Sequence, residues 1–265
     1  MQAEGKLAEL KENLAALEQL VLGYSGGTDS TFLMAVAHQV LGKRLIAATL
    51  FSPLVSAKEQ AECLEIARDL GIEPHLLEVD PLKIPGFSDN PPDRCYICKH
   101  HLFSRIWELA RSEGIAHVAD GTNLDDLNDY RPGLLALQEL GVRSPLLEVG
   151  MGKEDIRYLS RELGLPTWNK PAAACLASRF PYGQTIDREG LARVEQAEAL
   201  LQEAGFKQVR VRVHHDLARI EIPPTERTNI TDTSLMDSIN RQLQQLGFKY
   251  VCLDLQGYRT GSLNV

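Results

Sequence analysis

A glycine turn between two apolar runs constrains this chain more than any other feature. The run at 20–24 is typical of a buried strand, and the run from Thr31 to about Gln39 is typical of a helix. Between them lies Ser25–Ser30, with the sequence Ser-Gly-Gly-Thr-Asp-Ser. A strand, a glycine turn and a helix in this order direct backbone N–H groups and the positive end of the helix toward an anion. The pattern therefore predicts a phosphate-binding loop, although an ordinary capped glycine turn has a similar local sequence.

The side chains of this loop suggest how a phosphate would be held. Gly26 and Gly27 lack Cβ atoms, so the backbone can approach a ligand closely. The loop lacks the Gly-Lys-Ser/Thr ending of a Walker-type P-loop, which argues against a kinase or a GTPase. It carries three hydroxyl donors and one carboxylate that could hold a divalent cation beside the phosphates, namely Ser25, Thr28, Ser30 and Asp29.

Strands and helices alternate along the first half of the chain. This alternation predicts an α/β fold with a parallel sheet and helices on both faces, whose ligands bind outside the carboxyl ends of the strands. Asp120-Gly121-Thr122-Asn123 follows the predicted strand at 116–119, so we expect it at the same edge as the glycine loop. Further strands are predicted at 44–51, 75–79 and 144–147, and helices at 4–18, 56–70, 100–113 and 153–163.

Two loops interrupt this pattern. Residues 81–99 hold four prolines and a Cys-x-x-Cys pair, Cys95 and Cys98. We expect a lid over substrate or nucleotide here; a zinc or iron–sulfur site is the alternative, but its nearby ligand set is incomplete. The next loop carries three acids that could contact magnesium or ribose, or could simply be solvated, namely Asp125, Asp126 and Asp129.

The segment 168–183 contains a candidate reactive thiol, Cys175. Small residues surround it, and Ser178 and Arg179 follow within one helical turn. A nearby guanidinium favours the thiolate, which is the nucleophilic form, and Lys170 could add to that field. A lone cysteine in an alanine-rich segment could equally be a packed core thiol.

The pattern changes after Gly183, and we place a domain boundary there, between 1–183 and 184–265. A helix at 187–204, strands at 207–213 and 218–222, a helix at 234–246 and a strand at 250–255 predict a small α+β domain. We expect this domain to serve substrate binding or oligomerisation. Strict alternation places Arg210 and Arg212 on one face of their strand. The pair could be a solvated edge, or it could form a phosphate or carboxylate clamp with Arg259.

Composition limits the partners and the compartment. Hydrophobic residues make up 44% and charged residues 24% of the 265 residues, as in an ordinary globular protein. A net charge of −8 argues against a nucleic-acid partner and favours a small-molecule substrate. There is no apolar run long enough for a membrane span and no signal peptide, so we expect a cytoplasmic protein without a membrane partner. Five cysteines, an odd number, argue against a disulfide framework.

The motifs also carry a family resemblance. Ser-Gly-Gly-Thr-Asp-Ser resembles the pyrophosphate loop of the N-type ATP pyrophosphatases, which cleave ATP between its α- and β-phosphates and transfer AMP to a substrate oxygen. Other motifs narrow this resemblance to the LarE family, the ATP-dependent sacrificial sulfur transferases of nickel-pincer nucleotide biosynthesis. They occur in the order Asn90–Lys99, Asp120–Asn123, Cys175–Gly183, Val209–Arg212 and Gly257–Ser262.

This resemblance implies a Rossmann-like fold of the adenine nucleotide alpha hydrolase type, with ATP and Mg²⁺ as cofactors. The implied substrate is pyridinium-3,5-biscarboxylic acid mononucleotide, whose carboxylate is adenylated before Cys175 gives up its sulfur and becomes dehydroalanine. The implied ATP-binding residues are Ser25, Gly26, Gly27, Thr28, Asp29, Ser30, Gly121 and Thr122, with Asp29 as metal ligand. The implied catalytic residues are Cys175, Ser178, Arg179 and Glu198, and Arg210, Arg212 and Arg259 would bind the substrate phosphate. A homo-oligomer is expected by analogy.

Several alternatives stay open at this point. Glu195 and Glu198 lie one turn apart and could supply a base or a metal ligand, or could simply form an exposed helix face. Cys95 and Cys98 could join Cys175 in an iron–sulfur cluster, as in the cluster-dependent relatives. A tRNA-thiolating enzyme, an ammonia-using amidotransferase and a nucleotide-binding sensor are the rival functions.

Overall fold

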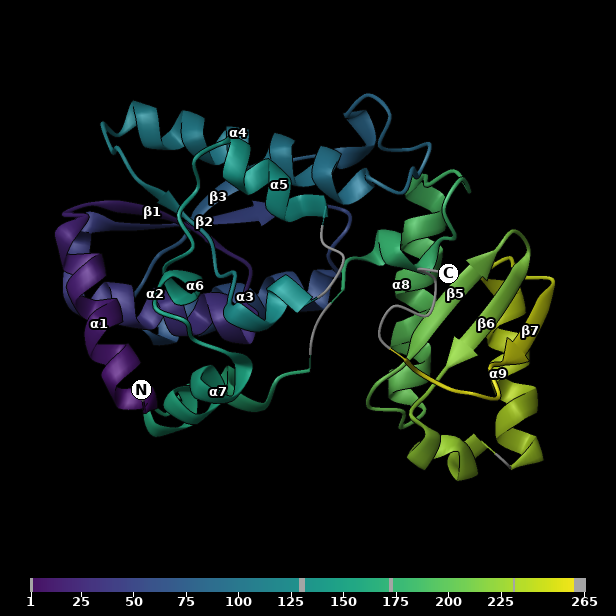
Figure 1. The fold of residues 1–265 in the computed structure, drawn as a ribbon. Coiled ribbons are helices and arrows are strands. Elements are labelled where there is room, and N and C mark those ends of the chain that lie inside the picture. The colour runs from purple at the N-terminus through teal and green to yellow at the C-terminus, as the bar shows by residue number, and fades with distance from the viewer. Residues whose placement is uncertain (1, 129–131, 172–173, 231, 260–265) are drawn as a thin grey trace. The chain divides into compact units, whose positions relative to one another are not determined.

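The computed structural model describes residues 2–128, 132–171, 174–230 and 232–259. The chain forms two compact units (Figure 1). The first unit comprises residues 1–80 and 93–173, and the second comprises residues 81–92 and 174–265. The second unit thus takes in a short segment from the first half of the chain and begins just before Cys175. The expected substrate-binding or oligomerisation role of the C-terminal domain stays a prediction.

A four-stranded parallel sheet organises the first unit, as the sequence predicts. Its strand order is β3-β2-β1-β4. Because β1 and β4 are parallel neighbours, the segments that follow them leave the sheet at the same edge. The strands are β1 (Leu20–Tyr24), β2 (Leu45–Phe51), β3 (His75–Glu78) and β4 (Val118–Ala119).

Helices cover both faces of this sheet (Figure 1). One hydrophobic core joins the sheet to α1 (Ala3–Ala16), α2 (Thr28–Leu41), α3 (Ala57–Asp69), α6 (Pro145–Glu148) and α7 (Lys153–Glu162). A second core joins the opposite face to α4 (Arg94–Ser112) and α5 (Pro132–Glu139). The predicted α/β class with helices on both faces is confirmed.

Two local predictions in this unit are wrong. Cys95 and Cys98 do not lie in a lid loop, because α4 begins at Arg94, directly after the proline-rich stretch ends. Residues 145–148 form one helical turn rather than a strand, with Pro145 in the first helical position, where its fixed φ suits a helix. Just before this turn, Arg143 forms an isolated parallel β-bridge with Ala119 of β4.

The second unit has the predicted helix–strand–strand–helix–strand order. Its sheet has the order β5-β6-β7, with an antiparallel and then a parallel pair. The elements are α8 (Arg188–Glu203), β5 (Arg210–His214), β6 (Leu217–Glu221), α9 (Thr233–Gln245) and β7 (Tyr250–Leu253). Within the described residues, the chain has no helix of the length and hydrophobicity that a membrane span requires.

Both faces of β5 are covered. Val211 and Val213 are fully buried, as alternation predicts for one face. Arg210 and Arg212 on the other face are only 9% and 6% exposed, so the interpretation as a solvated edge is wrong. Arg212 pairs with Glu221, and Glu198 and Tyr258 lie near Arg210. No sequence pattern on the strand itself indicates these partners.

Candidate functional site

The glycine loop connects β1 to α2 at the carboxyl edge of the sheet. Gly27 caps the helix, and Gly26 has a φ of 71°, in the left-handed region. A Cβ atom on Gly26 would lie 2.8 Å from Cβ of Cys63, so a glycine is required for steric reasons as well. Cys63 is buried, and burial raises the pKa of its thiol, as is typical of a cysteine that packs without reacting.

The predicted hydroxyl donors of the loop are engaged within the protein. The hydroxyl groups of Ser25 and Ser30 lie 3.0 Å apart and hydrogen-bond to each other. The Thr28 hydroxyl donates to the carbonyl oxygen of Thr167 at 2.8 Å. The Lys170 ammonium donates to the carbonyl oxygen of Gly26 at 3.3 Å, so a cation lies beside the loop. These bonds fix the loop in one conformation.

Asp29 is the acidic residue of the loop, and one side of its carboxylate has no partner. Oδ2 accepts hydrogen bonds from the amide of Asn123, at 3.3 Å, and from the ammonium of Lys153. Oδ1 is buried and has no hydrogen-bond partner in the described part of the chain. Burial raises the pKa of the Asp29 carboxyl, and Lys153 opposes that shift. An orphaned carboxylate oxygen of this kind fits a hard divalent cation such as Mg²⁺.

The segment after β4 packs directly against the glycine loop. A Cβ atom on Gly121 would lie 3.0 Å from the backbone nitrogen of Ser30, so the two loops meet closely. Asp120 is buried and accepts hydrogen bonds from the backbone and hydroxyl of Thr122 and from the hydroxyl of Ser144. Lys99, one residue after the Cys-x-x-Cys pair, also reaches Asp120, at 3.4 Å. The structure thus brings Gly121 and Thr122 beside Ser25–Ser30, as expected.

The acids of the next loop support the backbone. Asp125 accepts the backbone N–H of Lys153 at 2.6 Å, and Asp126 accepts that of Asn123 at 3.0 Å. Asn123 and Lys153 are the two residues that donate hydrogen bonds to Asp29, so both carboxylates help to position the partners of Asp29. Asp129 lies outside the described residues.

Lys153 is a functional candidate that the folded structure brings to the glycine loop from a distant part of the sequence. It is the first residue of α7, and its ammonium contacts Asp29. A cation at the N-terminus of a helix is electrostatically unfavourable. A lysine directly after a glycine at a helix start is therefore a sequence signal that points to a functional role for this residue. The pairing itself joins residues 124 positions apart, which no local pattern reveals.

In the second unit, Cys175 is exposed and precedes a short 3₁₀ turn, Leu176–Arg179. Arg179 is 3% exposed and holds this turn from within. Its guanidinium donates to the carbonyl oxygens of Ala174 (2.7 Å) and Cys175 (3.0 Å) and to the hydroxyl of Ser178 (2.9 Å). The alternative of a packed core thiol is therefore wrong, because Cys175 is exposed while its backbone carbonyl is held by Arg179.

Glu198 completes this arrangement. Its two carboxylate oxygens accept two hydrogen bonds from Arg179, both at 2.9 Å, and Oε1 also accepts the backbone N–H of Val211 at 2.9 Å. The side chain is buried, so the expectation of an exposed helix face is wrong for Glu198. These contacts are those of a group that positions Arg179 and β5.

The arginines of β5 differ in their surroundings. Arg212 donates two hydrogen bonds to the fully buried Glu221, at 3.0 and 2.8 Å, and one to the carbonyl oxygen of Ser178 at 2.9 Å. The guanidinium of Arg210 lies over the ring of Tyr258, 5.4 Å from its centroid. Burial and repulsion from Arg179 lower the pKa of Arg210. Arg259 is exposed, and residues 260–262 of its motif lie outside the described residues.

Comparison with known proteins adds to this geometry. Residues 6–101 match the family model of NAD synthase. The chain is 42% identical to pyridinium-3,5-bisthiocarboxylic acid mononucleotide synthase of Lactiplantibacillus plantarum over 98% of its own length and 94% of that protein. The chain belongs to the LarE family. Members of this family are ATP-dependent sulfur-transferring enzymes with a pyrophosphate loop.

Two further relatives have no assigned function. An uncharacterized protein of Synechocystis is 42% identical over 98% of the chain and 97% of its own length. One from Methanocaldococcus jannaschii is 30% identical over 96% of the chain and 98% of its own length. These matches span both units, so the LarE family shares the whole two-unit chain and not only the nucleotide loop.

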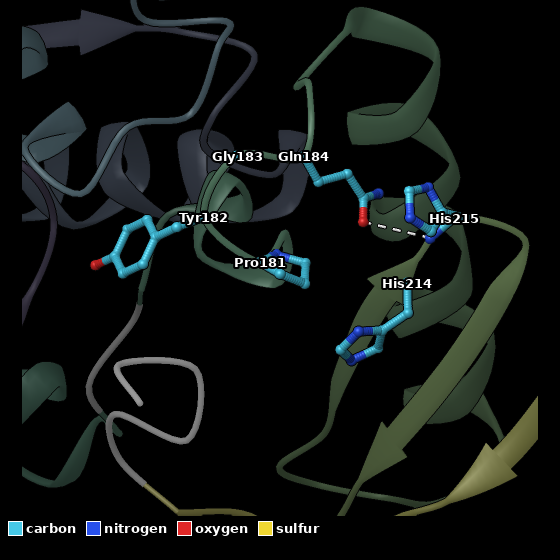
Figure 2. A pocket seen from close by; sticks show the side chains of 6 residues that line it. All are labelled: Pro181, Tyr182, Gly183, Gln184, His214 and His215. Carbon is cyan, nitrogen blue, oxygen red and sulfur yellow. Dashed lines mark hydrogen bonds between the residues drawn. The ribbon is translucent and has the colours of Figure 1, made fainter.

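The second unit of this LarE-family chain also contains a cavity of about 350 Å³ (Figure 2). The segment 181–184 forms one side, and His214 and His215 at the end of β5 form the other. The Gln184 side chain accepts the backbone N–H of His215 at 3.3 Å and holds the two sides together. Nε2 of His214 is buried without a partner in the part of the chain that the structure describes. Pro181, Tyr182 and Gly183 belong to the motif Cys175–Gly183, whereas Gln184, His214 and His215 lie outside the quoted motifs.

The Cys-x-x-Cys pair of the LarE-family chain lies on the first turns of α4, with Cys95 exposed and Cys98 half-buried. Among the described residues there is no group of three or more His, Cys, Asp or Glu side chains arranged to hold a metal ion.

Proposed function

We propose that this chain is the sulfur transferase that makes the thiocarboxylates of the nickel-pincer nucleotide. It would adenylate a carboxylate of pyridinium-3,5-biscarboxylic acid mononucleotide and then donate the sulfur of Cys175, giving a thiocarboxylate, AMP and pyrophosphate. Membership of the LarE family supports the reaction class. The single observation that carries the proposal is an exposed Cys175 before a turn whose backbone is held by the buried Arg179.

The first step is assigned to the glycine loop. A carboxylate is a poor electrophile, and adenylation converts one of its oxygens into a leaving group. The backbone N–H groups of Ser25–Ser30 and the N-terminus of α2 would stabilise the departing pyrophosphate. Asp29 would hold Mg²⁺ through its orphaned Oδ1, and the bound ion would neutralise phosphate charge.

The second step is assigned to Cys175. Its thiolate would attack the adenylated carbonyl carbon, forming a C–S bond while the C–O bond to AMP breaks. A base from solvent would take the Cys175 Hα proton while the Cβ–S bond breaks, and the electron pair of that bond would leave with the sulfur on the thiocarboxylate. The residue left in the protein is dehydroalanine. Each protein molecule could then supply one sulfur atom.

The remaining residues are assigned by their contacts. Arg179 and Glu198 would act by positioning the Cys175 turn, because their charged groups pair with each other and with the backbone around that turn. Arg210 and Arg259 would bind the substrate phosphate. Arg212 would support that site through Ser178 and Glu221.

Intact mass spectrometry tests this proposal. After incubation with ATP, Mg²⁺ and the pyridinium substrate, we expect the protein to lose mass equal to one H₂S, located at Cys175. Cys175→Ser should show no loss, while Cys252→Ser, which removes another exposed thiol of the same unit, should behave like the parent chain. Repeated turnover without a mass change, or full activity in Cys175→Ala, would refute the sacrificial mechanism.

A further inference from the structure

One wall of the cavity beside His214 is held by a buried asparagine from a distant part of the sequence. Asn90 is fully buried, and its side-chain amide donates to the carbonyl oxygens of Phe180 at 3.3 Å and Pro181 at 2.7 Å. The backbone carbonyl oxygen of Asn90 accepts the N–H of Gly183 at 2.9 Å. These three bonds fix the backbone of this wall, so the cavity is formed before any ligand binds.

The other wall is the polar face of β5. Strand alternation places Arg212 and His214 on the same face, opposite the buried valines. The chain segment 178–184 lies over this face: the carbonyl oxygen of Ser178 accepts a hydrogen bond from Arg212 at 2.9 Å, and residues 181–184 face His214 across the cavity (Figure 2). The segment that follows Cys175 therefore leads directly to this cavity.

Two buried nitrogen atoms on this face lack a hydrogen-bond partner among the residues that the structure describes. They are Nε2 of His214 and Nε of Arg219, which lies on β6 opposite Arg212. Burial and then the positive charge of Arg219 lower the pKa of His214, and His215 and Arg212 act in the same direction, whereas Glu221 opposes them. Buried nitrogen atoms without a partner, in surroundings that are positive on balance, favour an anionic acceptor.

We propose that this cavity binds a carboxylate of the pyridinium ring, namely the one that is not being adenylated. The identity of the ligand rests on the proposed function. The carboxylate would accept a hydrogen bond from Nε2 of His214, and the ring would lie against the side chains of Pro181 and Tyr182. The volume of about 350 Å³ is in the range of small-molecule sites.

The position of the cavity along β5 suits a mononucleotide. His214 lies four residues beyond Arg210 on the same face, about 13 Å along the strand. A substrate with its phosphate at Arg210 would therefore place its ring near His214, with the turn that follows Cys175 between the two ends. Holding one carboxylate in the cavity would orient the ring and leave the other free to react.

Nuclear magnetic resonance titration of the full chain with pyridine-3,5-dicarboxylate, without ATP or metal, tests this site. The seven histidines give imidazole signals that single substitutions assign. We expect the dicarboxylate to shift the His214 signal and to raise the pKa of His214, because a bound carboxylate favours the imidazolium. The neutral pyridine-3,5-dicarboxamide should bind about tenfold more weakly or less, since it cannot form a charge-assisted hydrogen bond.

Substitutions sharpen the test. His214→Ala should weaken binding of the dicarboxylate about tenfold or more, as followed by the His215 signal. His75→Ala, which removes an exposed histidine of β3 in the first unit, should leave binding unchanged. Thermal unfolding checks that each variant is folded, and His214→Asn replaces His214→Ala if the latter is not.

The contrary results are specific. If the dicarboxylate shifts neither His214 nor His215, the cavity is not its site. If the dicarboxamide binds as tightly, or inorganic phosphate at the same concentration shifts His214 equally, the cavity does not recognise a ring carboxylate. Binding at His214 without loss of H₂S from Cys175 would keep the site and refute the sulfur transfer. Normal H₂S loss in His214→Ala at an unchanged half-saturating substrate concentration would refute the site and leave the proposed function intact.

Discussion

Two regions of the molecule differ in how their charged groups are paired. The nucleotide edge of the first unit consists of Ser25–Ser30 and residues 120–123, and the arginine core of the second consists of Arg179, Arg210, Arg212 and the side chains that contact them. At the nucleotide edge, the key groups are glycines, backbone N–H groups and a carboxylate with one unpartnered oxygen. In the arginine core, Arg179 and Arg212 are paired with buried glutamates and with backbone carbonyl oxygens. The first region leaves a carboxylate oxygen without a protein partner among the described residues, whereas most charges of the second hold the protein itself in place.

Because of this difference, substitutions in the two regions need different measurements. An arginine that saturates its donors on Glu198 and on the backbone contributes mainly to the position of the Cys175 turn. A glycine beside the phosphate site contributes mainly through the space it leaves free. Substitutions in the arginine core should therefore lower stability first, and substitutions at the nucleotide edge should lower ligand binding first.

The largest effect is expected for Glu198→Ala. Removing this carboxylate leaves the buried guanidinium of Arg179 without its ion pair and the N–H of Val211 without its acceptor. Breaking one partner of a buried pair costs about 3–5 kcal/mol of unfolding free energy. Urea unfolding measures this loss. Glu203→Ala, an exposed acid on the same helix, should change stability by less than about 0.5 kcal/mol.

A small loss in Glu198→Ala would contradict the description of this region as a structural core. In that case the carboxylate would be available for proton transfer, and the earlier expectation of a base at Glu198 would regain support.

An intermediate effect is expected at the glycine loop, where Gly26 and Gly27 should respond differently. Gly26→Ala places a Cβ atom 2.8 Å from Cys63 in a left-handed conformation, which costs at least about 1–2 kcal/mol for the backbone alone. Gly27 has a φ of −79°, and its nearest neighbour to an added Cβ is 3.5 Å away, so Gly27→Ala should cost less than about 1 kcal/mol. Urea unfolding and ATP titration are the measurements.

Both variants should bind ATP more weakly, but for separate reasons. Gly26→Ala distorts the loop, whereas Gly27→Ala only obstructs the approach of a phosphate. Equal stability losses in the two variants would show that the glycines have the same role and would remove this distinction from the comparison.

The nucleotide edge was predictable because its geometry is local. The strand–turn–helix order and the glycines at 26 and 27 are adjacent in sequence, and alternating elements place Gly121 at the same edge by topology alone. The contact of Lys153 with Asp29 was not predicted, because Lys153 lies on another helix far along the sequence. Residues 81–99 were assigned to one loop because four prolines dominate the stretch, yet nothing after Pro92 prevents a helix.

For the arginine core, the sequence predicted the helices and strands correctly but not the burial of the arginine side chains. Alternation correctly predicted that β5 is a strand, but burial of Arg210 and Arg212 depends on Glu198, Glu221 and Tyr258, which lie on other elements. A charged side chain on a strand is usually solvated, so the sequence alone favours the wrong environment. Pairs such as Arg179 with Glu198 form across 19 positions, and only the folded chain selects them.

The smallest effect is expected for the part of the pH dependence of unfolding that His214, at the end of β5, contributes. Burial and the nearby charge of Arg219 lower the pKa of His214 below its usual value. The folded state therefore favours the neutral imidazole, and its contribution to stability is complete above about pH 6.5 and is lost as the pH falls through the lower folded pKa. His214→Gln should remove this part of the pH dependence, by less than about 1 kcal/mol because solvent screens the half-exposed ring. Urea unfolding between neutral and mildly acidic pH measures it, with the exposed His75→Gln of the first unit as the control. A loss of stability on acidification that is as steep in His214→Gln as in the parent chain would assign the dependence to other groups.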